Sequence, residues 1–175
     1  KMCSQSSDLE GTREWCGTGW TGQPAVWERG GELWVAFGAY DRNVHVLDAV
    51  TGAPRMDPFP TGDLIKGTLT VDPQGHPLIY VGSRDNYLRV LAYDSGELVE
   101  LWSLSAYAVD DRLWNDDWDG APAIIDDYMF VGGENSNFHV VKLMNEKLTA
   151  LRRDLYREAA DHLDKEVLIL RISTC

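Results

Sequence analysis

The chain has 175 residues, of which 44% are hydrophobic and 25% charged, a composition typical of a folded globular protein rather than a disordered one. Its formal net charge is −12, so DNA, RNA and anionic membrane surfaces are poor partners, whereas cations and basic proteins fit better. No apolar run in the sequence approaches the roughly 20 residues that a membrane-spanning helix needs.

Residues 1–23 are predicted to be an N-terminal extension or a partial copy of the repeat described below. They contain no apolar core of a signal peptide, so we expect any such leader to precede Lys1. Cys3 and Cys16 can pair in a disulfide, which would indicate an oxidising compartment; the alternative is three free thiols, Cys175 included. The sequence has no C-x-x-C pair or Cys/His cluster of the kind that binds zinc.

Three stretches repeat one pattern: GAYDRNVHVL from Gly38, GSRDNYLRVL from Gly82 and GGENSNFHVV from Gly132. In each copy an Asp or Asn follows the glycine by three residues, an apolar residue by six, and a His or Arg by seven. The glycines are 44 and 50 residues apart, near the period of about 40–50 residues that propeller blades have. The sequence therefore predicts an all-β fold of about three propeller-type blades.

Each copy is expected to form a small antiparallel sheet. A β-branched and aromatic run precedes each glycine and an alternating run follows the polar turn, which predicts a hairpin. Further strands are expected before and after this hairpin, which brings each sheet to three or four strands. The first hairpin is expected at 33–37 and 44–47. Strands that precede a hairpin are expected at 68–72 and 122–126, and strands that follow one at 53–59 (interrupted by proline) and 97–104.

The stretch HVLDAVTG, residues 45–52, resembles the hairpin of the quinoprotein-like (PQQ-like) propeller repeat, and VLAYDSG, residues 90–96, is a looser copy. The resemblance covers about residues 24–143 and implies a propeller with four-stranded blades. Enzymes of this family usually hold pyrroloquinoline quinone between a tryptophan and a disulfide of adjacent cysteines, with calcium nearby. This chain has no Cys-Cys pair, so the resemblance assigns the quinone to none of its residues. It implies instead a non-catalytic binding or scaffold module.

Three blades cannot close a ring, since closed propellers have four or more. Two interpretations stay open: the chain is part of a larger propeller, or it associates with itself through its open blade edges. The expected partners are therefore a protein or the remaining blades. Many relatives are secreted or membrane-anchored, so an extracellular or periplasmic location is expected, with any anchor N-terminal to Lys1. The alternative function is a quinoprotein oxidoreductase whose other parts hold the quinone and calcium.

Residues 144–175 differ from the repeat and are predicted to be a helical tail, with one helix over about 146–164 packed on a blade edge. The tail also loosely resembles small two-helix phosphatases that act on a sporulation response regulator, although their Ser-Gln-Glu-Leu-Asp signature is absent. A foreign or frame-shifted junction is the third alternative. The residues of the predicted helical stripe are Leu148, Leu151, Leu155, Ala159 and Leu163.

The segment WNDDWDGAP, residues 114–122, holds the candidate metal ligands Asp116, Asp117 and Asp119. Several carboxylates in one short loop favour calcium, although the spacing is not that of an EF-hand. The alternative is a solvated acidic turn that leads into a blade. The sequence indicates no catalytic residue, and no cofactor is expected beyond this calcium.

The repeated polar positions are interpreted as structural. Asp41, Asp85 and Asn135 are expected to stabilise the three hairpin turns. The equivalent residues His45, Arg89 and His139 are expected to share one place on each blade rather than to form a catalytic pair. Tryptophans are predicted to pack between blades, the alternative being an aromatic floor for a ligand. They are Trp15, Trp20, Trp27, Trp34, Trp102, Trp114 and Trp118.

Overall fold

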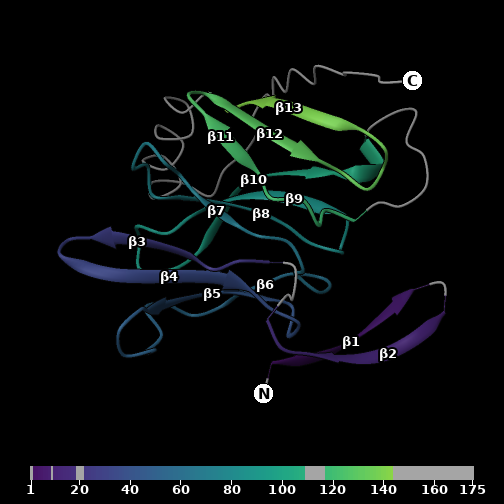
Figure 1. The fold of residues 1–175 in the computed structure, drawn as a ribbon, viewed down its shortest axis with the longest axis horizontal. Helices are drawn as coiled ribbons and strands as arrows, with labels where there is room; N and C mark the ends of the chain where they lie inside the picture. Colours follow the sequence, from purple (N-terminus) through teal and green to yellow (C-terminus); the bar gives the residue numbers. More distant parts are fainter. Residues whose placement is uncertain (1, 9, 19–21, 109–116, 144–175) are drawn as a thin grey trace, which may run out of the picture.

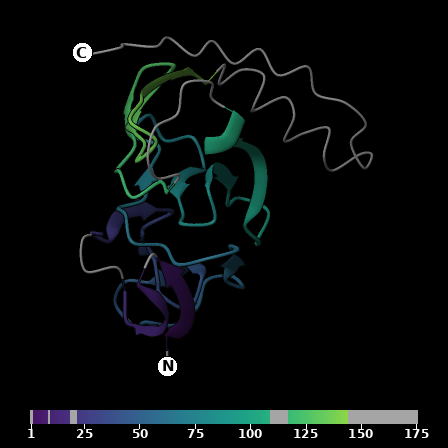
Figure 2. The ribbon, with the colours of Figure 1, turned by 90° about the vertical axis from the view of Figure 1, so that its right-hand side faces the viewer.

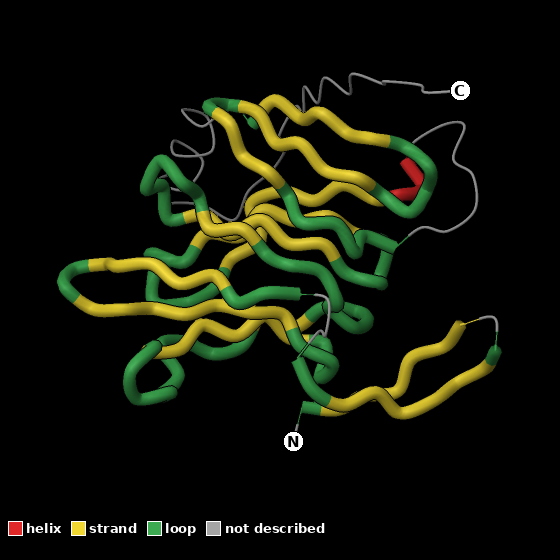
Figure 3. Tube along the Cα trace, in the orientation of Figure 1, coloured by secondary structure: helices red, strands yellow, loops and turns green. Residues whose placement is uncertain are grey.

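The computed structural model describes residues 2–8, 10–18, 22–108 and 117–143. In this part of the chain the structure is built from antiparallel strands, with one short 3-10 helix (Figure 1, Figure 3). None of the helices found among these residues is long and apolar enough to cross a membrane.

Three consecutive sheets follow each other along the chain, and each is a meander of neighbouring strands. Blade 1 consists of β3 (Ala25–Arg29), β4 (Glu32–Gly38), β5 (Asn43–Asp48) and β6 (Phe59–Pro60). Blade 2 consists of β7 (Thr70–Val71), β8 (Leu78–Gly82), β9 (Tyr87–Ala92) and β10 (Val99–Ser105), after which comes the 3-10 helix η1 (Ala106–Ala108). Blade 3 consists of β11 (Ala123–Ile125), β12 (Tyr128–Gly132) and β13 (Phe138–Lys142).

The all-β, blade-type fold predicted from the repeat is thus confirmed, with two differences. The outer strand expected at 53–59 is reduced to β6 and an isolated bridge between Leu47 and Pro54. Prolines in this segment lack the N–H that a longer ladder would need. Blade 3 has three strands among the described residues, where the family resemblance implies four. The predicted helix at 146–164 lies outside the described residues.

The hairpin turns of the blades share one geometry. The glycine that ends the second strand pairs with the apolar residue six positions on: Gly38 with Val44, Gly82 with Leu88, and Gly132 with Phe138. The residue four after each glycine adopts the left-handed region, with φ of 67° at Arg42, 74° at Asn86 and 68° at Ser136. Three turns of the same register and backbone confirm that the sequence pattern marks a structural repeat.

Side-chain hydrogen bonds repeat with the backbone. The side-chain oxygen three residues after each glycine accepts a bond from the backbone N–H two residues on. These pairs are Asp41–Asn43 (3.2 Å), Asp85–Tyr87 (3.1 Å) and Asn135–Asn137 (3.2 Å). The same oxygen-bearing group also bonds the side chain four residues on, in the pairs Asp41–His45 (3.0 Å), Asp85–Arg89 (2.6 Å) and Asn135–His139 (3.2 Å). These contacts confirm the prediction that Asp41, Asp85 and Asn135 stabilise the hairpin turns.

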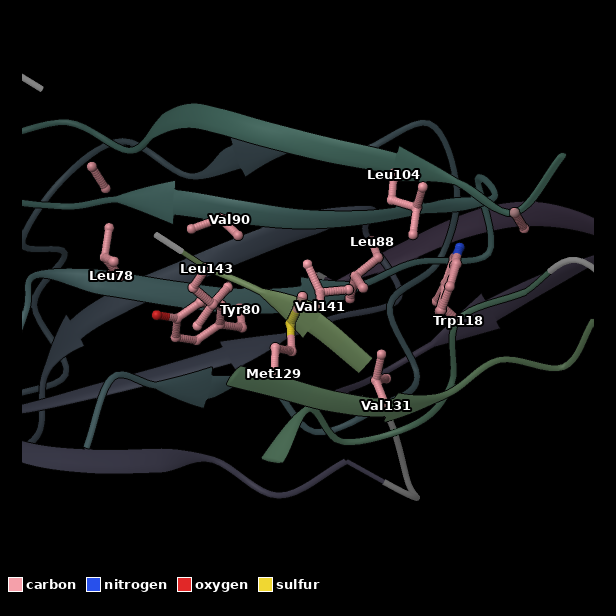
Figure 4. Close-up of a cluster of buried hydrophobic side chains, with 12 residues drawn as sticks. Leu78, Tyr80, Leu88, Val90, Leu104, Trp118, Met129, Val131, Val141 and Leu143 are labelled. Atoms are coloured by element: carbon pink, nitrogen blue, oxygen red, sulfur yellow. The ribbon is translucent and has the colours of Figure 1, made fainter. Parts of the chain in front are cut away.

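The blades stack so that blade 2 lies between blades 1 and 3 (Figure 1, Figure 2). One buried cluster joins blades 1 and 2, and a second joins blades 2 and 3 (Figure 4). Every residue of β8 is buried, because both sides of the middle sheet are covered. Trp27 and Trp34 pack with Tyr93 in the first cluster, and Trp118 lies in the second, which agrees with the predicted packing of tryptophans between blades.

The N-terminal segment forms a separate hairpin of β1 (Cys3–Asp8) and β2 (Gly11–Cys16), closed by a disulfide between Cys3 and Cys16. The hairpin contacts the turn of blade 1 and the connection from β6 to β7: the Ser4 hydroxyl donates to the carbonyl of Tyr40 at 2.6 Å, and the Ser6 hydroxyl donates to the Asp63 carboxylate at 3.0 Å. It therefore lies across the turn ends of the blades and not along their sheets.

Candidate functional site

Four charged side chains of the described residues, Lys66, Arg84, Asp117 and Asp119, form a partly buried polar cluster. The elements that carry it are the β8–β9 turn of blade 2, which holds Arg84, and the two segments that connect successive blades. Lys66 belongs to the connection from β6 to β7, and Asp117 and Asp119 belong to the connection that enters β11. Because turns and inter-blade connections meet at the same end of the blades, residues far apart in the sequence come together there.

Two ion pairs organise the cluster. The Nε of Arg84 donates to the Asp117 carboxylate at 2.7 Å, and both side chains are buried, at 10% and 6% exposure. The Lys66 ammonium lies 3.5 Å from Oδ2 of Asp119. Arg84 also donates to the Ser6 hydroxyl at 3.3 Å, so the N-terminal hairpin contributes to the same network. The pairs join blade 2 to the connection into blade 3 and to the first hairpin.

Burial dominates the protonation of the two acids. It raises the pKa of Asp117, although the hydrogen bond from Arg84 acts in the opposite direction. Burial likewise raises the pKa of Asp119 to about 6, against a smaller lowering by Lys66. The Lys66 ammonium lies 3.5 Å from Oδ2 of Asp119, and Oδ1 of Asp119 is buried without a hydrogen-bond partner among the described residues. Asp119 is thus an acid that titrates close to neutral pH.

The predicted calcium ligands are only partly described by the structure. Asp116 lies outside the described residues, whereas Asp117 and Asp119 face Arg84 and Lys66, respectively. Asp119 keeps one carboxylate oxygen that a cation could use. In the described part of the chain the grouped metal-type ligands are instead Cys3, Glu14 and Cys16, and the two sulfurs of this group are bonded to each other. Calcium binding at 116–119 remains a prediction.

Trp118, between the two acids, is fully buried, and its indole N–H donates to the carbonyl of Asn86 at 3.1 Å. It occupies the space above Gly82, where a Cβ would lie 2.4 Å from the Trp118 carbonyl oxygen. In the preceding connection, Ile65 occupies the space above Gly38 in the same manner. We call Ile65 and Trp118 the plug residues, because each comes from the connection into the next blade and fills the space above a glycine of the blade before it.

A groove of about 550 Å³ runs between the first strands of blades 1 and 2, β3 and β7. Arg29 lies over the ring of Tyr93 at 5.0 Å, and two acids and an indole border the same groove. The sequence does not predict this groove, because the groove forms only where β3 lies beside β7. The one local signal is the alternating burial pattern of AVWER, which marks β3 as a strand with two different faces. The lining residues are Ala25, Val26, Trp27, Glu28, Arg29, Leu69, Thr70, Val71, Asp72, Pro73, Gly75 and Tyr93.

The repeated residues His45, Arg89 and His139 do not meet. Each bonds the acid or amide of its own turn, in a separate blade. Arg89 bonds Glu100 of the neighbouring strand as well, at 3.0 Å. The described polar groups therefore build turns and join blades, and what they offer chemically is charge recognition and proton uptake at Asp119.

The fold and these contacts define a protein with propeller-type blades that are joined through polar turns. No protein-family model matches the chain, and a search of curated proteins finds no match. Among solved structures the chain is similar to BamB from Moraxella catarrhalis, with 16% sequence identity and a TM-score of 0.41. The alignment covers 71% of this chain and 47% of that one, so the chain spans about half the length of this structure.

Proposed function

We propose that the chain is a non-catalytic binding and scaffold module of the quinoprotein-like type, and that its blades form part of a larger propeller. Its partners in this proposal are proteins or the remaining blades. The net charge of −12 favours basic surfaces on such partners.

The observation that carries the proposal is the different burial of the three sheets. Both sides of the middle blade are covered, since β8 is buried throughout and β9 is buried beyond its first residue. In blade 3 burial alternates along β12, and Phe138 of β13 is 45% exposed, so one side of that sheet is only partly covered by the described residues. A blade that is complete in a propeller has a neighbour on each side, and blade 2 alone meets this condition among the described sheets.

An extracellular or periplasmic location is part of the proposal. The disulfide between Cys3 and Cys16 supports it, because structural disulfides persist in oxidising compartments. The turn contacts support the non-catalytic role, because each repeated titratable side chain is bonded within the turn of its own blade.

Quinone binding separates this function from the alternative of a quinoprotein oxidoreductase. Purified chain is dialysed against pyrroloquinoline quinone with and without calcium, and the bound fraction is read by absorbance. We expect no stoichiometric uptake. One quinone retained per chain in the presence of calcium would overturn the non-catalytic proposal. Calorimetric titration with calcium alone, repeated on Asp119→Asn, shows whether any calcium effect belongs to the acidic loop.

A further inference from the structure

We propose that the groove between β3 and β7 binds an extended peptide segment of a partner protein, which adds to the edge of β3 as a strand and places an acidic side chain on Arg29. The inference rests on the proposed binding function and names the chemistry of one partner. Both strands that form the groove belong to the described residues of blades 1 and 2.

The groove lies between the edges of two sheets. Side chains of a strand alternate between the two sides of its sheet, so a groove over one side would be bordered by every second residue. All five residues of β3 border this groove, and so do the consecutive residues 69–73 around β7. β3 and β7 are each the first strand of their sheet, and in it they pair only with β4 and β8, respectively. The unpaired edge of each strand therefore faces the groove.

Backbone groups of β3 point into the groove. In an antiparallel pair of strands, opposite residues exchange either both backbone hydrogen bonds or none, and the two kinds of pair alternate. Ala49 donates to the carbonyl of Leu33 at 2.9 Å, so the backbone groups of Leu33 point away from β3. Leu33 is opposite Glu28, and the N–H and C=O of Glu28 are consequently directed to the free edge. Val26, two residues earlier, has the same orientation.

The edge of β7 is oriented in the same way. Asp72 donates to the carbonyl of Leu78 at 3.0 Å, so this pair is hydrogen-bonded. The adjacent pair, which contains Val71, is then of the other kind, and the backbone groups of Val71 point away from β8. The described residues offer no backbone partner to these groups of either strand. Strand edges of this kind pair readily with another chain.

Arg29 supplies a positive charge at the groove. Its Cζ lies 5.0 Å from the centre of the Tyr93 ring and 5.7 Å from that of Trp34, and these contacts hold the side chain in place. Burial raises the pKa of the Tyr93 hydroxyl, and a hydrogen bond with Arg29 acts in the opposite direction. Arg55 and Arg84 form ion pairs, whereas no carboxylate of the described residues pairs with Arg29. Its remaining N–H donors match a carboxylate of a ligand.

An added strand would present side chains to both sides of β3. Trp27 and Arg29 lie on the side that packs against Tyr93 of blade 2. Val26 and Glu28 lie on the other side and are exposed, Val26 at 61%. Opposite residues of neighbouring strands stabilise the pair when their charges are opposite or when both are apolar. The matching segment carries an acid opposite Arg29 and a base opposite Glu28, with apolar residues at the two positions that follow toward Val26.

These features select a peptide as the occupant. A small carboxylate would bond Arg29 but would leave the backbone groups of both strand edges without partners. A wholly acidic peptide would be repelled by Glu28 and by the net charge of −12. A segment in which an acid and a base are neighbours satisfies both charges and both edges of the groove.

The test is calorimetric titration of the full chain with peptides blocked at both ends. Acetyl-Thr-Glu-Lys-Val-Val-Thr-amide matches β3 in the antiparallel direction, and acetyl-Thr-Val-Val-Lys-Glu-Thr-amide matches it in the parallel direction. The same peptides with Gln in place of Glu, and sodium acetate, are the comparison ligands. Arg29→Gln removes the charge, and Arg13→Gln is the matched control, because Arg13 also lies over an aromatic ring, 4.7 Å from Trp15, but in the N-terminal hairpin. Thermal unfolding shows whether each variant is folded.

We expect one matched peptide to bind the unmodified chain and Arg13→Gln equally, and Arg29→Gln to weaken it by at least about fivefold. The corresponding Gln peptide should bind the unmodified chain and Arg29→Gln within about twofold of each other, because it makes no charged contact with residue 29. The bound peptide should also slow amide hydrogen exchange at Val26 and Glu28, with the amides of β13 unchanged. This last measurement needs no variant, so it tests strand addition even where Arg29→Gln does not fold.

Three results would overturn the proposal: binding of neither matched peptide, binding that Arg29→Gln leaves unchanged, or binding without protection of Val26 and Glu28. Acetate that binds as tightly as the peptides would overturn it as well, because the site would then be one for small carboxylates. None of these outcomes changes the quinone measurement, so a failure here is distinguishable from a failure of the proposed function.

Discussion

Three equivalent glycines provide a sharp test of the blade contacts, because the same substitution should have different effects at each. Gly38, Gly82 and Gly132 all end the second strand of a blade, and all have β-strand backbone. A Cβ at Gly82 would lie 2.4 Å from the carbonyl oxygen and 2.5 Å from the Cβ of Trp118. At Gly132 it would meet no described atom within 4 Å.

The expected size follows from this geometry. At Gly82 the backbone of Trp118 would have to move by about 1 Å within a buried cluster, and overpacking of this kind costs about 1–3 kcal/mol. At Gly38 the overlap is with the Ile65 side chain, so a similar loss is expected. Alanine at Gly132 should be neutral or stabilising by about 0.4–1 kcal/mol, because it reduces the freedom of the unfolded chain. For a chain of this size these values separate Gly82→Ala from Gly132→Ala by about 5–15 °C in Tm.

The assay is thermal and urea unfolding followed by circular dichroism. The three variants and the unmodified chain are compared at one protein concentration. Equal destabilisation by Gly132→Ala and Gly82→Ala would refute the assignment of Gly132 as an open position. An unchanged Gly82→Ala would refute the close packing of Trp118.

Further predictions concern protonation and the disulfide. The pKa of Asp119 in the folded chain, about 6, exceeds the unfolded value of 3.8, so the folded state binds more protons and stability should fall as pH rises from about 4 to about 6. Asp119→Asn should match the unmodified chain near pH 4 and exceed it by about 1–2 kcal/mol at pH 7 in urea unfolding, and parallel pH profiles would contradict this. Cys3→Ser, which opens a loop of sequence separation 13, should lower the opening free energy of the N-terminal hairpin by about 3 kcal/mol. Faster amide exchange in β1 and β2, with β8 unchanged, would show it; unchanged exchange in the hairpin would count against it.

The repeat could be predicted from sequence because its interactions are local. The bonds from Asp41 to Asn43 and His45 span two and four residues, so one short pattern contains both donor and acceptor. The same pattern predicts the turn positions of Asp85 and Asn135, whose bonds to Tyr87 and Asn137 are equally local. The glycine spacing then indicated blades, and the observed pairing registers agree.

The polar cluster and the groove could not be predicted in this manner. Arg84 and Asp117 are 33 residues apart, and no local pattern shows that a turn and an inter-blade connection meet. From its sequence the acidic loop predicts a calcium site, whereas the cationic neighbours Lys66 and Arg84 lie far from it along the chain. The groove likewise depends on β3 lying beside β7, which is a property of how the sheets stack. The outer strand of blade 1 pairs with β5 at only two positions, and the sequence does not show which residues of the proline-containing segment find a partner.

The N-terminal hairpin has a mechanical consequence. The Cys3–Cys16 disulfide links the two ends of the hairpin. Its Ser4 bonds Tyr40 of blade 1, and its Ser6 bonds Arg84 of blade 2. A rotation of blade 1 relative to blade 2 would therefore have to break one of these contacts of the hairpin. The hairpin thus restricts the angle between the two sheets from outside the hydrophobic core, and reduction of the disulfide should make this angle more variable while both sheets stay folded.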